Sequence, residues 1–197
     1  MIQGVLFDMD GLMFDTEPIS RDGWIEAGRE MGVPLDEGVV LQLRGTSAAH
    51  GDDVLRKAFG DSFDCAQARE IRTRYLTETL ERIGIPLKDG LLELLSYLKE
   101  EGIPPAFATS TNRERAMDYL RRAGVDKYFS GSVCGDEAGR SKPYPDIFLR
   151  AAREIGRDPR DCMVLEDSPN GLRAGLAAGC VTVMVPDLTP PTEEFYA

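Results

Sequence analysis

The sequence contains no long hydrophobic run, and its few cysteines follow no metal-ligand spacing. No apolar stretch approaches the roughly 18 residues that a membrane-spanning helix requires. The first residues do not combine a basic region with a long apolar one, so we expect no signal peptide. The absence of a CxxC pair argues against a zinc site and a disulfide framework, and we expect reduced cysteines and a cytoplasmic location. The cysteines are Cys65, Cys134, Cys162 and Cys180.

Positive charge and histidine are also scarce. The chain has 23 basic against 34 acidic residues and a net charge of −11, which argues against a broad nucleic-acid-binding surface. We interpret the single histidine, His50, as a surface residue. The 42% hydrophobic and 29% charged content is typical of a globular protein. A length of 197 residues suggests either one ordinary domain or one core domain with a substantial insertion.

The first feature that points to chemistry lies at the N-terminus. Val5–Phe7 is a short apolar run that predicts a buried strand, and Asp8, Asp10 and Gly11 follow it directly. Two carboxylates at such a turn repel each other unless a cation lies between them. Oxygen ligands of this kind favour Mg²⁺ over Zn²⁺. The alternative is a polar turn without chemistry; an EF-hand loop does not fit, because apolar residues follow Gly11.

The next part of the chain, residues 15–85, is predicted to be an all-helical insertion. Apolar residues recur there at helical spacing, glycines lie at the expected helix ends, and no strand-like alternation is visible. The predicted helices are Pro18–Met31, Leu35–Leu43, Ala49–Phe59 and Asp64–Ile83.

From Pro86 onward the pattern alternates between strands and helices, which predicts a parallel, doubly wound α/β sheet. We expect Asp89 to cap the first helix of this part. The predicted strands are 105–108, 129–134, 162–165 and 181–185, with a helix between each pair. Residues 1–14 and 86–197 are thus predicted to form a Rossmann-like core, into which the helical segment is inserted.

Four polar clusters follow the predicted strands. They are Asp8 with Asp10, Thr109–Asn112, residues 140–142 ending in Lys142, and Glu166 with Asp167. In open α/β sheets, ligands bind outside the carboxyl ends of the strands. Together these clusters supply carboxylates for a cation, a lysine, hydroxyl groups and helix N-termini, which can bind a phosphoryl group.

Each cluster also has a simpler interpretation when it is taken alone. Thr109–Asn112 can be an N-cap, Lys142 a surface lysine, and residues 166–168 an ordinary helix start. The convergence of all four clusters on one edge of one sheet favours the site.

In this order, these segments resemble the motifs of the haloacid dehalogenase (HAD) superfamily, in its β-phosphoglucomutase-like phosphatase branch. The matching segments are 8–17 (DMDGLMFDTE), 107–110 (FATS), 141–148 (SKPYPDIF) and 164–171 (VLEDSPNG). The resemblance covers essentially the whole chain. It implies a HAD-like Rossmann-like core with a helical cap over residues 15–85.

The resemblance also implies roles for the site residues. Asp8 would be the nucleophile that forms an aspartyl-phosphate, and Asp10 the general acid and base. Lys142 would neutralise charge, and Thr109 would bind a phosphoryl oxygen. Mg²⁺ would be bound by Asp8, Asp10 through its backbone carbonyl, Glu166 and Asp167. The residues expected to bind substrate are Thr109, Ser110, Thr111, Asn112 and Lys142.

The implied function is hydrolysis of a small phosphorylated metabolite, such as a sugar phosphate, by a monomer or weak homodimer. No nucleic acid or membrane partner is expected. Dehalogenases and phosphonatases of the superfamily lack an acid at the position of Asp10. Phosphonatases also use a cap lysine, which we do not find here. Trp24, Arg44 and Arg72 are candidate pocket residues, although Trp24 fits better in the core of the cap.

Two other functions remain as alternatives. A sugar-phosphate mutase of this type carries a cap histidine and a cap arginine where this chain has Ser20 and, after Arg44 to Ser47, Ala48. Without that arginine the cap cannot form bidentate hydrogen bonds to a second phosphate, unless Arg44 or His50 replaces it. The remaining alternative is a binding module with a relic site, which the intact acidic residues and Lys142 disfavour.

Overall fold

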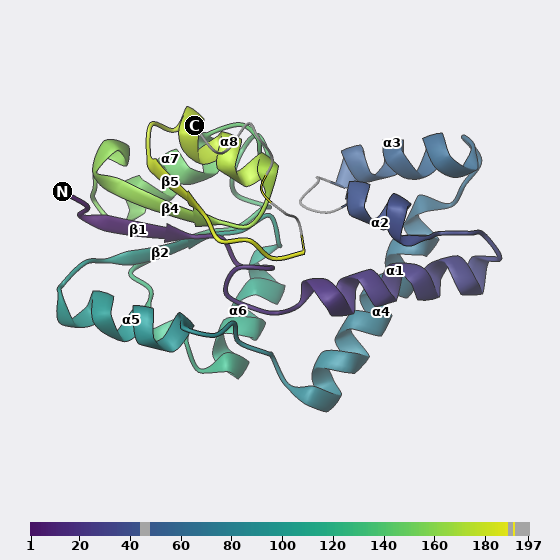
Figure 1. Ribbon diagram of the computed structural model, residues 1–197, viewed down its shortest axis with the longest axis horizontal. Helices are drawn as coiled ribbons and strands as arrows, with labels where there is room; N and C mark the ends of the chain where they lie inside the picture. Colours follow the sequence, from purple (N-terminus) through teal and green to yellow (C-terminus); the bar gives the residue numbers. More distant parts are fainter. Residues whose placement is uncertain (44–47, 189–190, 192–197) are drawn as a thin grey trace. The chain divides into compact units, whose positions relative to one another are not determined.

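A computed structural model describes residues 1–43, 48–188 and 191. The chain divides into two compact units, Met1–Asp15 with Ile85–Ala197 and Thr16–Gly84. The first unit is built on a parallel sheet and the second is helical (Figure 1). Among the described residues, no helix is both long and apolar enough to span a bilayer.

The sheet of the first unit has five parallel strands in the order β3-β2-β1-β4-β5. This confirms the predicted α/β fold class. The strands are β1 (Gly4–Phe7), β2 (Pro105–Ala108), β3 (Gly131–Val133), β4 (Cys162–Glu166) and β5 (Val181–Met184).

Helices cover both faces of the sheet. The helices α7 (Asp146–Glu154) and α8 (Pro169–Ala177) lie on one face, and α5 (Leu91–Glu100) and α6 (Arg113–Ala123) lie on the other (Figure 1). Two short 3₁₀ helices, η1 (Asp126–Tyr128) and η2 (Pro159–Asp161), precede β3 and β4.

Alternate residues of the strands supply the core on the two faces. Leu6 packs with Phe148 of α7 in one buried cluster. The next residue, Phe7, makes an edge-to-face contact with Phe129, as does Phe107 of the neighbouring strand. This period of two is what a strand requires when both of its faces are buried. Each such fully buried side chain contributes about 1.5–3 kcal/mol, so the strands are held in the register that sets the positions of the polar residues after them.

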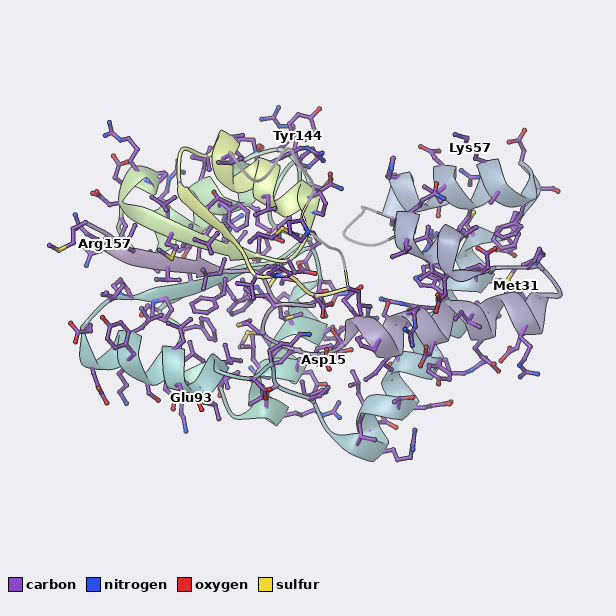
Figure 2. All side chains as sticks on the ribbon, viewed as in Figure 1. Asp15, Met31, Lys57, Glu93, Tyr144 and Arg157 are labelled. Carbon is purple, nitrogen blue, oxygen red and sulfur yellow. The ribbon has the colours of Figure 1, made fainter. Side chains whose placement is uncertain are left out.

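The helical unit contains α1 (Glu17–Met31), α2 (Glu37–Leu43), α3 (Ala48–Phe59) and α4 (Cys65–Ile83). Trp24 packs against two apolar clusters of this unit, one around Leu55 and one around Ile71. It is therefore part of the core of the helical unit. The helix α1 passes close to α4 at Gly23, where a Cβ would lie 2.9 Å from the carbonyl oxygen of Arg72. Polar side chains such as Lys57 on α3 point outward, as does Glu93 on α5 of the first unit (Figure 2).

Some predicted boundaries differ from the structure. Asp89 does not cap α5: the N-cap is Gly90, at φ +83°, and its left-handed backbone begins the helix without a side-chain hydrogen bond. The third strand is shorter than predicted, because η1 and its C-cap Phe129 occupy the residues before Gly131. Predictions that involve Arg44 to Ser47, and most of the tail after residue 188, lie outside the described residues.

Candidate active site

The acidic and basic residues predicted from the sequence meet at the carboxyl ends of the central strands. Asp8 follows β1 directly, and its backbone N–H still donates to the carbonyl of Leu165 in β4 at 3.0 Å. Glu166 is the last residue of β4, and Asp167 comes next. The carboxylate oxygens of Asp8, Glu166 and Asp167 lie within 4.8 Å of one another, and all three residues are buried.

Lys142 joins these carboxylates from the loop between β3 and α7. Its Nζ donates to Asp8 Oδ1, to Glu166 Oε1 at 2.6 Å and to the carbonyl of Ala108 at 3.2 Å. The ammonium also lies 5.1 Å from the centre of the Phe148 ring. Lys142 is buried, so the alternative interpretation as a surface lysine is wrong.

The electrostatics of the cluster follow from this burial. Burial raises the pKa of Asp8 well above its usual value; Lys142 opposes that shift, and Glu166 and Asp167 add to it. Burial acts to lower the pKa of Lys142, but Asp8 and Glu166 outweigh burial and the pKa is raised. One ammonium thus faces three carboxylates, and a divalent cation would restore the balance of charge.

Two glycines make the cluster geometrically possible. Gly11 has φ +85°, and a Cβ there would lie 2.4 Å from Asp167 Oδ2. A Cβ at Gly171 in α8 would lie 1.7 Å from Glu166 Oε1. Since carbon cannot approach oxygen so closely, both carboxylates occupy their places only because these two positions lack a side chain.

Ser168 is a contact residue that was not among the predicted site residues. Its backbone N–H and its hydroxyl donate to Glu166 Oε2 at 3.0 and 2.9 Å, and its Oγ accepts from the Gly171 N–H as the N-cap of α8. The sequence signal was present, because a serine just before a proline indicates a helix start. What the sequence does not show is that this cap also orients a carboxylate.

The predicted substrate-binding loop, Thr109–Asn112, follows β2. Thr109 is buried, and its Oγ1 accepts from the Thr111 N–H at 3.0 Å. Ser110 is exposed. Thr111 Oγ1 donates to Asp10 Oδ2 at 2.8 Å, which brings Asp10 to this loop.

The last residue of this loop, Asn112, caps a helix. Its Oδ1 accepts from the Arg115 N–H at 3.0 Å as the N-cap of α6. The N-cap interpretation therefore applies to Asn112, whereas its predicted contact with substrate stays a prediction.

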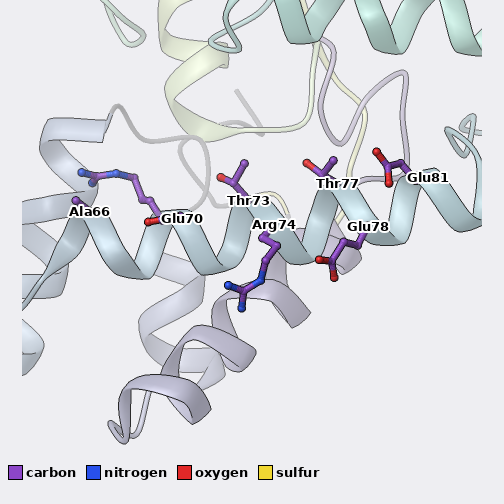
Figure 3. Close-up of a pocket in the computed structure, with 8 residues that line it drawn as sticks. Ala66, Glu70, Thr73, Arg74, Thr77, Glu78 and Glu81 are labelled. Carbon is purple, nitrogen blue, oxygen red and sulfur yellow. The ribbon is translucent and has the colours of Figure 1, made fainter.

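The other candidate residues have surroundings of their own within each unit. Arg140 forms an ion pair with Asp146 at 2.9 Å and stacks over Tyr144. In the helical unit, Arg72 Nη2 donates to Ser20 Oγ at 2.5 Å, and His50 is exposed on α3. A shallow hollow along α4 (Figure 3) is lined by residues of that helix alone, and none of the predicted site residues is among them.

The carboxylate cluster has the donor set that a hard divalent cation requires. Mg²⁺ binds carboxylate oxygen and retains water ligands, and three buried carboxylates with a net negative charge fit such an ion. With an aspartate beside a lysine and a hydroxyl-bearing loop, the arrangement can stabilise a phosphoryl group during transfer.

Comparisons with known proteins agree with this chemistry. The family model of haloacid dehalogenase-like hydrolases matches residues 2–179. The phosphorylated carbohydrates phosphatase of Thermotoga maritima is 32% identical over 90% of this chain and 82% of its own length. Hexitol phosphatase A of Escherichia coli is 33% identical over 98% of this chain and 88% of its own length. The crystal structure of CbbY from Rhodobacter sphaeroides in complex with phosphate is 30% identical, with a TM-score of 0.78 over 94% of this chain and 87% of that one.

Proposed function

The chain belongs to the haloacid dehalogenase-like hydrolases and is a phosphoric monoester hydrolase, and from this membership we propose that it hydrolyses phosphorylated sugars with Mg²⁺ through an aspartyl-phosphate on Asp8. The observation that carries this proposal is the contact of Lys142 with both Asp8 and Glu166 beside Asp167. The names of the relatives from Thermotoga maritima and Escherichia coli support the substrate class.

The proposed reaction has two steps. In the first, an Asp8 oxygen bonds to phosphorus while the bond from phosphorus to the sugar oxygen breaks, and the leaving oxygen takes a proton from Asp10. In the second, water attacks phosphorus, Asp10 takes the proton of the water, and the Asp8 carboxylate and inorganic phosphate are released. Lys142 offsets the charge of Asp8 in both steps, and the hydroxyl of Thr109 donates to a phosphoryl oxygen.

Asp8, Glu166 and Asp167 would hold Mg²⁺ through side chains, and Asp10 through its backbone carbonyl. When bound, the ion reduces the repulsion between a carboxylate nucleophile and a phosphate dianion. We assign the catalytic core to residues 1–14 and 86–197, and the choice of substrate to the helical segment 15–85, acting as a cap.

The mutase alternative is not favoured. Ser20, at the position of the mutase histidine, accepts the hydrogen bond of Arg72 and offers no imidazole. Ala48, at the position of the mutase arginine, cannot bind a second phosphate. A mutase would convert β-glucose 1-phosphate to an isomer when primed by a bisphosphate, whereas we expect release of inorganic phosphate.

A phosphatase assay tests the proposed function. The purified chain is incubated with p-nitrophenyl phosphate and a panel of phosphorylated sugars, with Mg²⁺ or with EDTA, and phosphate release is measured. We expect turnover with Mg²⁺ that is lost in EDTA and in Asp8→Asn, which keeps the shape of the side chain but not its nucleophilicity. Equal turnover by Asp8→Asn and the unaltered chain would overturn the proposal.

A further inference from the structure

Thr111 connects the loop after β2 to the aspartate after β1. Its hydroxyl Oγ1 donates to Asp10 Oδ2 at 2.8 Å, across about a hundred residues of sequence. The contact has good geometry for a hydroxyl donating to a carboxylate, and bonds of this kind are stronger than those between neutral groups.

We propose that Thr111 is a positioning residue for Asp10, rather than a residue whose main role is to bind substrate. The proposal rests on the proposed function, because it requires Asp10 to be the general acid and base. The observation that supports the proposal is the hydrogen bond from the Thr111 hydroxyl to Asp10 Oδ2.

Thr111 is itself fixed on both sides of its peptide unit. Its N–H donates to Thr109 Oγ1 at 3.0 Å, and its carbonyl accepts from the Gly135 N–H at 2.9 Å. A Cβ at Gly135 would lie 2.1 Å from the carbonyl oxygen of Ser110, so the loop after β3 approaches this loop as closely as glycine allows. The hydroxyl of Thr111 is therefore presented to Asp10 from a backbone with little freedom to move.

Arg113 also links the loop after β2 to the loop after β3. Arg113, the first residue of α6, donates from Nη2 to Glu137 Oε2 at 2.6 Å and from its backbone N–H to Asp136 Oδ1 at 3.1 Å. Two loops that follow neighbouring strands are thus joined through Thr111 and Arg113. A side chain anchored in this way can hold the acid in one rotamer through both steps of the reaction.

The proposed role leaves the proton balance of the reaction unchanged. In the first step the proton leaves the Asp10 carboxyl and passes to the leaving sugar oxygen. In the second step the proton of the attacking water passes to the Asp10 carboxylate. Thr111 donates throughout and neither gains nor loses a proton.

A merely structural contact would behave differently. If Thr111 only joined two loops, its loss would lower the rate on every substrate by the same factor. If Thr111 acts through Asp10, its loss will matter most where the leaving oxygen most needs a proton. Alkoxide-like leaving groups need one, and p-nitrophenolate barely does.

The test is a leaving-group series with p-nitrophenyl, phenyl and p-methylphenyl phosphate, measured as kcat/KM for the unaltered chain, four threonine variants and Asp10→Asn. Thr111→Val and Thr111→Ala remove the hydroxyl, Thr111→Ser retains it, and Thr77→Val is the same change at an exposed site on α4 (Figure 3). Thermal unfolding of each variant verifies that it is folded.

We expect both hydroxyl-free variants to lose at least about tenfold more activity on phenyl phosphate than on p-nitrophenyl phosphate. Thr111→Ser should restore the leaving-group dependence of the unaltered chain, and Thr77→Val should have the activity of the unaltered chain across the series. A uniform loss in Thr111→Val and Thr111→Ala, or a change in KM alone, would overturn the proposal.

Asp10→Asn separates this inference from the proposed function. If Asp10→Asn has the steep leaving-group dependence and the Thr111 variants do not, Thr111 has no part in positioning the acid. If Asp10→Asn itself responds like the unaltered chain, the assignment of Asp10 fails, and the role of Thr111 fails with it.

Discussion

At the scale of single residues, Asp8 and Asp10 have different surroundings although they are two positions apart. Asp8 is buried against Lys142 and two other carboxylates. Asp10 is half-buried and accepts a hydrogen bond from a neutral hydroxyl. These surroundings suit a metal-linked nucleophile in one case and a proton carrier in the other.

This difference predicts separable effects of two substitutions. Asp10→Asn should retain Mg²⁺ affinity while losing about a hundredfold or more of turnover, because it removes the proton that the leaving oxygen takes. Asp167→Ala should weaken Mg²⁺ binding itself, because it removes a ligand. Calorimetric titration with Mg²⁺ measures the affinity of both variants, with the exposed Asp61→Ala as a control, and the phosphatase assay measures turnover. Equal weakening of Mg²⁺ binding in Asp10→Asn and Asp167→Ala would show that the roles are not divided in this way.

A second prediction concerns the glycine that lies against Glu166. Gly171→Ala places a methyl group where the Glu166 carboxylate lies, so that carboxylate must move away from Lys142. We expect a loss of about 1–3 kcal/mol in the free energy of unfolding, as for other overpacked sites, together with weaker Mg²⁺ binding. Chemical denaturation measures the first effect.

The matched control for that substitution is Gly38→Ala. Gly38 lies exposed in α2, where a Cβ meets nothing closer than 3.3 Å. In a helix this change is expected to be neutral or stabilising by up to about 1 kcal/mol. If both alanines had the same effect, the contact between Gly171 and Glu166 would not be important.

At the scale of helices, strands and loops, three of the four polar clusters lie at the end of a strand, and Lys142 comes from the loop between β3 and α7. Asp8 follows β1, Thr109 follows β2, and Glu166 ends β4. Asn112 begins α6 by accepting the Arg115 N–H. The strand register therefore fixes the backbone of the site, and the helix caps fix the loops.

Asn112→Ala tests the cap. The substitution removes the acceptor for the Arg115 N–H, which should cost about 1 kcal/mol of stability. Asn112→Asp restores an acceptor and should recover that stability, which thermal or chemical unfolding would show. A large loss of stability in Asn112→Asp as well would indicate that Asn112 contributes something other than a cap.

Much at this scale was predictable from the sequence. Apolar spacing and glycine positions predicted the helices and strands closely, since periodicity reports which faces are buried. The prediction for the start of α5 was wrong. Aspartate is a residue type that often caps helices, which favoured Asp89, but the N-cap is Gly90 with its left-handed backbone. The bond between Thr111 and Asp10 and the approach of Gly171 to Glu166 depend on how distant segments pack, which no local pattern records.

At the scale of the whole molecule, the site is a buried concentration of negative charge in a chain of net charge −11. Burial raises the pKa of Asp8, so the metal-free fold gains stability from a protonated Asp8 at low pH. That contribution is lost as the pH rises through the raised pKa. The raised pKa of Lys142 contributes stability that is lost only at strongly alkaline pH.

Stabilisation by Mg²⁺ should therefore depend on pH. Mg²⁺ and a proton compete for Asp8, whose pKa is raised, so the ion should raise the unfolding temperature of the metal-free chain more at about pH 8 than at about pH 5. Differential scanning calorimetry with and without Mg²⁺ measures this shift, and Asp8→Asn provides the control in which the difference shrinks. A shift of equal size at both pH values would mean that Asp8 does not couple protons to the ion.

The claim that Asp8 is the nucleophile can be tested directly on the intermediate. The chain is mixed with p-nitrophenyl phosphate and Mg²⁺, quenched in acid and treated with borohydride, which reduces an aspartyl-phosphate to homoserine. Peptide mass spectrometry then locates the change. We predict homoserine at position 8, formed only when substrate is present. Turnover without any modified Asp8, or modification at a different carboxylate, would contradict the mechanism.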